Sequence, residues 1–175
     1  MTSMNQPASI SERRANPGAG DFEGFFRAEH ARLLRALYLV TGSVEEAQEV
    51  AQDALVRVWE RWDRVRDLDN PTGYLYRTAM NVHRSALRRA RRAAGRLVGA
   101  GAGRDPFADA DDRDQVVRAL RGLAPRQRAA LVLTELLGYG SEEAGSILGV
   151  QAVTVRTLAS QGRAALRSTV EHDDA

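Results

Sequence analysis

The sequence predicts an all-α protein made of two small helical domains joined by a flexible linker. Apolar residues recur at steps of three and four through most of the chain, which is the period of an amphipathic helix. Strand signals are scarce, because β-branched residues rarely alternate with polar ones. The stretch VGAGAGRDPFADADD combines small residues, one proline and aspartates, a composition typical of a linker. We assign residues 95–113 to this linker.

Composition limits the classes of function. The chain has 175 residues, and 43% of them are hydrophobic, which is enough for packed cores. Since there is no cysteine, disulfides, thiolate catalysis and cysteine-ligated zinc are excluded. No metal-ligand spacing stands out, and we expect neither a metal nor a cofactor. No apolar run approaches membrane-spanning length and no signal peptide is present, so we expect a cytoplasmic protein without membrane insertion.

Charge is sorted along the chain although the formal net charge is only +2. Residues 71–104 carry eight arginines and no acidic residue, whereas residues 105–114 carry five aspartates and one arginine. All 25 cationic side chains are arginine, the side chain whose planar fork suits phosphate. Segregation of this kind indicates a nucleic-acid contact.

The first domain is predicted over residues 21–94, after a disordered leader at 1–20. Its first helix, about 21–40, is capped by Asp21 and ends at Gly42, which suits a left-handed residue. Ser43 and Glu46 have the spacing of a capping box and open a second helix, about 44–65. The expected core residues of these two helices are Phe22, Phe25, Phe26, Leu33, Leu34, Leu37, Tyr38, Ala47, Val50, Ala51, Ala54, Leu55, Val58, Trp59 and Trp62.

The third helix of this domain begins after Asn70, a plausible N-cap, and Pro71, which suits a first helical turn. Leu75, Ala79, Val82, Ala86 and Ala90 fall on its apolar face. Another face carries a one-sided arginine stripe, and two tyrosines lie at the start of the helix. The candidate contact residues of this face are Tyr74, Tyr76, Arg77, Asn81, Arg84, Arg88 and Arg89. Guanidinium groups contact phosphates, and flat rings stack on unpaired bases, so this helix is our candidate for contact with nucleic acid.

The second domain is predicted over residues 114–170, with a short tail at 171–175. Pro125 starts a helix that breaks at Gly138–Gly140, and Ser141 is expected to cap the next one. Gly149 makes a turn before a last helix at 151–167, a pattern typical of a helix-turn-helix. The side chains expected to face a DNA major groove are Gln151, Thr154, Arg156, Thr157, Ser160, Gln161 and Arg163.

Taken together, these residues resemble the extracytoplasmic-function sigma factors, the small bacterial initiation subunits of RNA polymerase. The run AQEVAQDALVRVW at 47–59 is similar, in register, to the family pattern A-E-D-L-V-Q-E-x-F-L-x-x-W. In that family this face binds the β′ clamp helices of the polymerase. The resemblance therefore implies the same role for Glu49, Gln52, Asp53 and Arg57, which by themselves form an ordinary polar stripe.

The resemblance extends to both DNA-reading parts. YLYRTAMN at 74–81 looks like the family helix that melts and reads the −10 promoter element, and the second domain resembles the family's region 4, which reads the −35 element. The pattern departs at Ala144-Gly145, where Ile-Ala is usual, and at Leu158 and Gln161, where arginine is common. Gly162 is expected to cost about 1 kcal/mol inside its helix, and fewer cations predict weaker −35 binding.

The sequence therefore predicts a transcription initiation factor that is not an enzyme. The implied partners are core RNA polymerase, through its β′ clamp helices and β flap, promoter DNA, and an anti-sigma factor of the kind that commonly silences this family. Two alternatives stand beside it. One is a stand-alone helix-turn-helix regulator that binds DNA without joining polymerase. The other is a nucleic-acid enzyme, which the three scattered histidines and the lack of a catalytic constellation disfavour.

Overall fold

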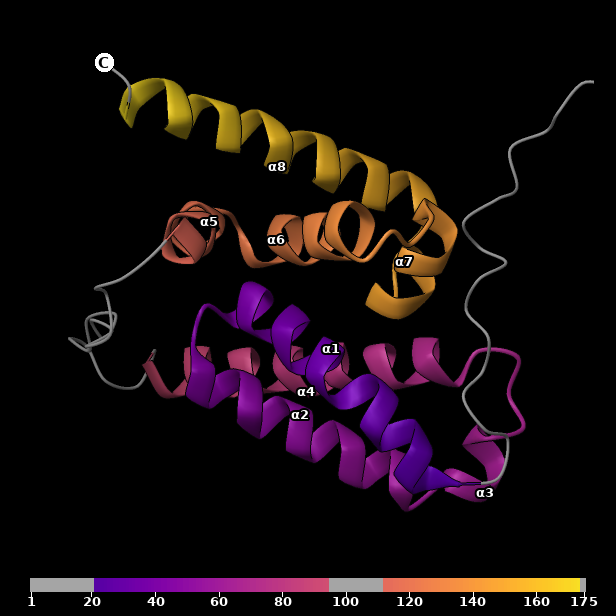
Figure 1. Cartoon of the computed structure of the whole chain (residues 1–175). Coiled ribbons are helices and arrows are strands. Elements are labelled where there is room, and N and C mark those ends of the chain that lie inside the picture. Colours follow the sequence, from indigo (N-terminus) through magenta and orange to yellow (C-terminus); the bar gives the residue numbers. More distant parts are fainter. Residues whose placement is uncertain (1–20, 95–111, 174–175) are drawn as a thin grey trace, which may run out of the picture.

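The computed structural model describes residues 21–94, here called the first half, and 112–173, the second half (Figure 1). No strand occurs in these two ranges, which confirms the all-α class. The predicted leader at 1–20 and most of the predicted linker, 95–111, lie outside the described residues. The elements are α1 (Phe22–Thr41), α2 (Val44–Trp59), α3 (Trp62–Val65), α4 (Pro71–Ala94), α5 (Asp112–Arg121), α6 (Pro125–Leu131), a π-helical turn (Val132–Leu136), α7 (Ser141–Leu148) and α8 (Ala152–Asp173).

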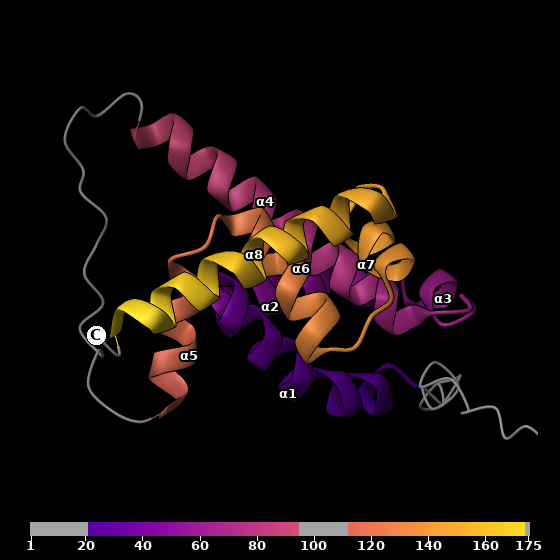
Figure 2. The same cartoon turned by 90° about the horizontal axis from the view of Figure 1, so that it is seen from above.

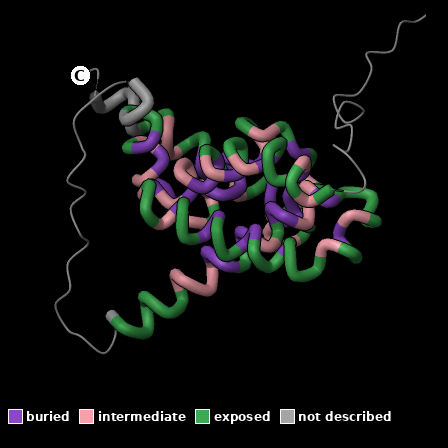
Figure 3. The backbone as a smooth tube through the Cα atoms, turned by 60° about the horizontal axis from the view of Figure 1, so that its bottom comes forward, coloured by how far each residue is buried: buried purple, intermediate pink, exposed green. Residues whose placement is uncertain are grey.

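The two halves stack as two layers (Figure 1). Helices α1, α2 and α4 form one layer, and α5 to α8 form the other, with α8 crossing the outer side of α6 (Figures 1 and 2). Contacts between the layers run from α4 to α7 and from α1 to α5 and α6. The buried apolar side chains form one continuous core through both layers. Figure 3 shows which stretches of the backbone carry buried residues. The predicted domains are therefore packed on one another in this structure.

The ends of α1 and the start of α2 follow the predicted capping chemistry. The carboxylate of Asp21 accepts hydrogen bonds from the N–H groups of Glu23 and Gly24 at 2.9 and 3.3 Å. Gly42 ends α1 with φ +76°, a left-handed conformation that glycine adopts without steric cost. Ser43 Oγ accepts from the N–H of Glu46 at 3.3 Å, so α2 begins where the capping box predicted.

The predicted helix at 44–65 is wrong in its second part. Helix α2 ends at Trp59, and α3 begins at Trp62 after Arg61 leaves the helical region with φ −120° and ψ 16°. This break redirects the chain, so Trp62 packs against the rings of Phe22 and Phe25, with centroids 5.5 and 4.9 Å apart. Trp59, expected in the core, is instead 61% exposed.

Helix α4 begins as predicted, with Asn70 Oδ1 accepting from the N–H of Gly73 at 2.7 Å. Its predicted apolar face is buried in the N-terminal part of the helix, at Leu75, Ala79 and Val82. Towards its C-terminus the helix leaves the core, and residues 88–93 are all exposed (Figures 2 and 3). The last arginines of the stripe therefore project from the body of the protein.

The second half contains the predicted helical hairpin with two local differences. Helix α6 continues into the π-helical turn Val132–Leu136, which the apolar period did not reveal. Gly138, with φ +68°, breaks the helix as expected. Ser141 is the first residue of α7 rather than its cap: the N–H of Gly140, the residue before it, donates to the Glu143 carboxylate at 3.3 Å. Within residues 21–94 and 112–173, every helix is too short or too polar to cross a lipid bilayer.

Candidate functional site

The polar side of α2 presents an exposed stripe formed by Glu49, Gln52, Asp53 and Arg57. We call these four residues the α2 stripe. Helix α2 buries Ala47, Val50, Ala54 and Val58 on its opposite side, against α1 and α4, so the stripe faces outward. The structure thus brings together the four residues that the sequence singled out for polymerase binding. Two carboxylates, an amide and a guanidinium on one helix face can make directional polar contacts with a partner helix.

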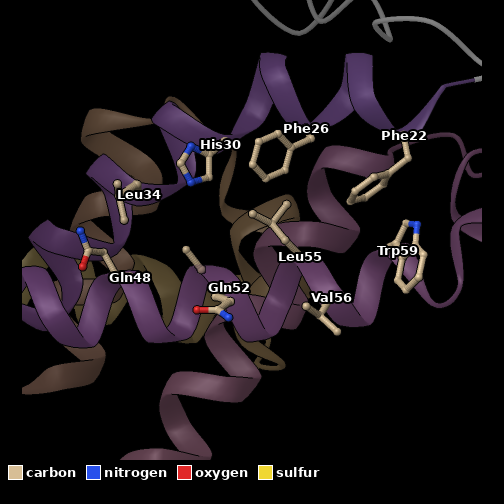
Figure 4. Close-up of a pocket in the computed structure, with 10 residues that line it drawn as sticks. Phe22, Phe26, His30, Leu34, Gln48, Gln52, Leu55, Val56 and Trp59 are labelled. Atoms are coloured by element: carbon tan, nitrogen blue, oxygen red, sulfur yellow. The ribbon is translucent and has the colours of Figure 1, made fainter.

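An apolar groove lies directly beside the α2 stripe, between α1 and α2 (Figure 4). It has a volume of about 620 Å³, and Gln52 belongs to both the groove and the stripe. Phe26 and the exposed Trp59 both line it. The Phe26 side chain is 36% exposed, and its ring is stacked on the His30 ring with centroids 4.8 Å apart. Sequence reasoning placed Phe26 and Trp59 in the core. The aromatic spacing of Phe22, Phe26 and His30 was the one signal of a continuous aromatic edge on α1.

The predicted DNA-contacting residues of α4 divide into exposed and covered ones. Arg77, Asn81, Arg88 and Arg89 are exposed, whereas Tyr74 and Arg84 are half-buried. Arg88 donates to the hydroxyl oxygen of Ser85 at 3.1 Å. The neighbouring Tyr74 side chain, through a hydrogen bond, raises the pKa of the exposed Arg61 guanidinium. The exposed members form a cationic face that follows α4 to its projecting end.

Tyr76 differs from the other predicted DNA contacts because it is only 1% exposed. Its ring meets the edge of Tyr139, from the loop before α7, with centroids 5.8 Å apart. The Tyr139 ring therefore covers part of the Tyr76 ring across the boundary between the two halves. Arg84 also contacts the second half, and its guanidinium hydrogen-bonds the side chain of its neighbour Asn81.

The helix-turn-helix consists of α7, the turn at Gly149–Gln151 and α8. Gly149 adopts φ +68°, and Val155 and Ala159 are buried on the inner side of α8. Six of the seven predicted major-groove residues are exposed, and Thr154 is half-buried. Three of them have partners within the protein. Thr157 donates to the carbonyl oxygen of Val153 at 3.0 Å, Gln161 accepts from the Gln127 amide at 3.3 Å, and Arg163 pairs with Glu135 at 2.5 Å.

Histidine, aspartate and glutamate side chains do not gather in groups of three with metal-binding geometry anywhere in the described ranges. The buried histidine, His83, contacts Glu46 of α2 and also lines a cavity between α4 and the start of α6.

Two known families match the chain, one over each half. Residues 25–93 match the Sigma-70 region 2 family, and residues 113–166 match the Sigma-70 region 4 family. The first match contains the α2 stripe and nearly all of α4, and the second contains the helix-turn-helix.

Two solved structures of similar fold span most of the chain. The sigma factor RpoE of Bartonella quintana, solved with the anti-sigma factor NepR, superposes with a TM-score of 0.75 at 22% identity, over 86% of this chain and 97% of that chain. CnrH, solved with the cytosolic domain of CnrY, gives a TM-score of 0.61 at 22% identity, over 89% and 92% of the two chains. At this identity the likeness concerns the fold.

Sequence relatives extend over most of the chain. The RNA polymerase sigma-E factor of Streptomyces avermitilis is 32% identical over 161 residues, which cover 88% of this chain and 87% of the relative. The ECF sigma factor SigM of Mycobacterium tuberculosis is 30% identical, and the match covers 90% of this chain and 83% of the relative. SigG of the same species is 27% identical, and this chain spans about half of its length, 50%. Both regions match in order, and two relatives are 32% and 30% identical over more than four fifths of their length, so the chain belongs to the extracytoplasmic-function family of RNA polymerase sigma factors.

Proposed function

We propose that this protein binds core RNA polymerase and directs it to specific promoters as an initiation factor. The observation that carries the proposal is the α2 stripe: Glu49, Gln52, Asp53 and Arg57 share one exposed face, in register with the pattern that the family uses for the β′ clamp helices. Complementary polar contacts on a rigid helix give orientation as well as affinity. The second half would add a contact to the β flap.

Promoter recognition would be divided between the two halves. The exposed arginines of α4 would neutralise phosphates of the melted −10 region, with Asn81 and the tyrosines reading or stacking unpaired bases. Helix α8 would enter the major groove of the −35 element with Gln151, Thr154, Arg156, Thr157, Ser160, Gln161 and Arg163. Selectivity then arises from binding free energy at two DNA elements.

In this role the protein acts without an active site of its own and works in the cytoplasm, where the polymerase is. An anti-sigma factor is a further expected partner. RpoE, which shares this fold, was solved with the anti-sigma factor NepR.

The deciding experiment is co-purification with bacterial core RNA polymerase. Wild type is expected to bind, and Glu49→Arg/Asp53→Arg is expected to lose binding because two carboxylates of the α2 stripe become cations. The matched control is Asp63→Arg/Asp67→Arg, which makes the same charge change at exposed positions outside the stripe. Circular dichroism checks that all three proteins are equally helical.

Loss of binding in the stripe variant alone supports the proposal. Equal binding of wild type and stripe variant to polymerase would overturn the role of the α2 stripe. If wild type binds promoter DNA but never core polymerase, the stand-alone regulator becomes the better account.

A further inference from the structure

Val153 is an exposed apolar side chain at the start of the second helix of the helix-turn-helix. It is the second residue of α8 and is 54% exposed. Its neighbours in the sequence include Gln151 and Thr154, two of the expected major-groove residues, but Val153 has no role so far. A single exposed aliphatic side chain is common on protein surfaces and by itself indicates nothing. The residues that surround Val153 on the helix surface therefore decide what it can do.

Val153 is the first of four small, uncharged side chains along the outer side of α8. Residues four, seven and eleven positions further along an α-helix fall on the same side of it. We call these four exposed residues the α8 ridge: Val153, Thr157, Ser160 and Ala164. The ridge lies opposite the buried Val155 and Ala159, through whose side α8 packs on its own layer, mainly on α6 and α7 (Figure 1).

The charged side chains of this part of α8 lie beside the ridge rather than on it. Arg156 and Arg163 are seven positions apart, so they share one flank of the helix. Arg163 is also paired with Glu135. A helix that enters a groove with the α8 ridge leading therefore presents methyl groups and one serine hydroxyl to the base edges, with guanidinium groups to the side.

Thr157 adds to the apolar character of the ridge, although it is usually counted as a polar residue. Its hydroxyl donates to the carbonyl oxygen of Val153 at 3.0 Å, a bond within α8 itself. The hydroxyl proton is not available to a base acceptor while this bond is made. The γ-methyl group of Thr157, one helical turn from those of Val153, then extends the apolar part of the ridge.

The major groove of DNA offers one apolar group that suits such a surface. Thymine presents its C5-methyl group there, whereas the distinguishing groups of the other bases are hydrogen-bond donors and acceptors. The N-terminal residues of a recognition helix are the ones that contact base edges. Apolar side chains gain free energy by covering a methyl group, but they leave the polar edge of a G·C pair without partners.

We propose that Val153 and Thr157 read thymine in the −35 duplex by apolar contact with its C5-methyl group, which makes Val153 a specificity-determining residue of α8. The proposal rests on the proposed function for the DNA element and adds the base and the atoms that are read. The flanking arginines supply affinity through charge, and the ridge supplies the choice of base.

Replacement of thymine by uracil tests the contact, because the two bases pair alike and differ only in the C5-methyl group. Wild-type, full-length protein first selects its preferred duplex from a randomised library. Each thymine of the selected site is then replaced singly by uracil, and electrophoretic mobility shifts give the affinities. Wild type should lose about fourfold in affinity at one position or more, the effect of one methyl group covered by apolar contact.

Variants of the ridge assign the loss to named methyl groups. Val153→Ala should bind the thymine and uracil duplexes equally at one of these positions. Thr157→Ser keeps the hydroxyl and removes the methyl group, so it should lower the discrimination. Thr157→Val keeps the methyl group and should preserve it. The matched control is Val116→Ala, the same truncation at a valine of α5 that is 50% exposed, and it should discriminate like wild type. Circular dichroism checks that all variants are equally helical.

Equal binding of the thymine and uracil duplexes by wild type at every position would overturn the proposal. Full discrimination in both Val153→Ala and Thr157→Ser would do so as well, because the methyl groups would then be read by other side chains. Failure to select any duplex would contradict the −35 role of α8 itself. The ridge is exposed in the free protein, so these measurements need no polymerase and are independent of the α2 stripe.

Discussion

The Nδ1 atom of His83 lies 3.0 Å from the Oε1 atom of Glu46, across the interface between α4 and α2. The sequence predicted that Glu46 would complete a capping box with Ser43. Its carboxylate instead contacts His83, while the N–H of Ser43 donates to Thr41 Oγ1 at 3.2 Å. This contact joins the helix that carries the arginine face to the helix that carries the α2 stripe, so it helps to set the angle between the two proposed binding surfaces.

His83→Ala should therefore destabilise the protein. The change opens space under α4 and leaves the Glu46 carboxylate, which is 35% exposed, without its contact, at an expected cost of about 1–3 kcal/mol. Urea denaturation followed by circular dichroism measures the free energy of unfolding. Gln48→Ala, at an exposed position of α2, is the control and should stay within about 0.5 kcal/mol of wild type. Equal values for both variants would mean that the contact contributes nothing.

Thr72→Val should expose the dependence of α1 on the first turn of α4. The Thr72 hydroxyl donates to Glu29 Oε1 at 3.1 Å, and the Glu29 side chain is only 6% exposed, with Arg32 3.9 Å away. Valine keeps the shape but removes the donor from a buried carboxylate, which costs about 1–3 kcal/mol. Thermal unfolding measures the effect. Thr72→Ser keeps the hydroxyl, and a loss as large in serine as in valine would argue against the hydrogen bond as the cause.

Gly145→Ala should destabilise the helix-turn-helix more than Gly162→Ala. A Cβ at Gly145 would lie 2.7 Å from the carbonyl oxygen of Val150, which belongs to the backbone of the turn. A Cβ at Gly162 would meet Leu131 Cδ1 at 2.7 Å, the end of a side chain that can turn away. We expect about 1–3 kcal/mol of overpacking cost at Gly145 and less at Gly162. Urea denaturation of the two variants makes the comparison, and a larger loss at Gly162 would contradict it.

These two glycines show what a sequence pattern cannot reveal. Gly145 and Gly162 look like weak points, because glycine lowers helix propensity. In the structure, Gly145 lets the turn approach α7, and Gly162 lets α8 approach α6, so their value depends on tertiary contacts. Caps such as Asp21 and Asn70 were predictable because their partners lie within three residues.

The proposed binding surfaces also contain some features that could be predicted from local sequence and others that could not. The α2 stripe was predictable, since four exposed positions follow from the helical period alone. The position of Trp59 was not, because it depends on where α2 ends. The covering of Tyr76 was also out of reach, because it depends on a residue 63 positions away, Tyr139. Long-range packing between the halves leaves no local period in the sequence.

Arg88→Ala/Arg89→Ala should weaken promoter opening without weakening polymerase binding. Both side chains are exposed on the projecting part of α4, away from the α2 stripe. Losing two phosphate contacts to a single strand should lower the slope of log affinity against log salt by about 1.4. Fluorescence of a labelled −10 strand bound by the reconstituted holoenzyme, titrated at several salt concentrations, measures it. The control is Arg35→Ala, which removes an exposed arginine of α1 and should leave the slope unchanged. An unchanged slope in Arg88→Ala/Arg89→Ala would show that these two arginines do not contact the DNA.

Glu135→Gln should strengthen binding of the second half to −35 duplex DNA, whereas Arg156→Ala should weaken it. Glu135 holds Arg163 at 2.5 Å, and both side chains are about half exposed, so the carboxylate competes with phosphate for that guanidinium. Its removal should raise affinity a fewfold, since one further cation can reach the backbone. Arg156 is exposed near the start of α8, where a recognition helix meets base edges. Electrophoretic mobility shifts with the full-length protein give both affinities, with Glu142→Gln as the control for an exposed acid outside the pair. A gain in the control equal to that of Glu135→Gln would assign the effect to net charge rather than to the release of Arg163.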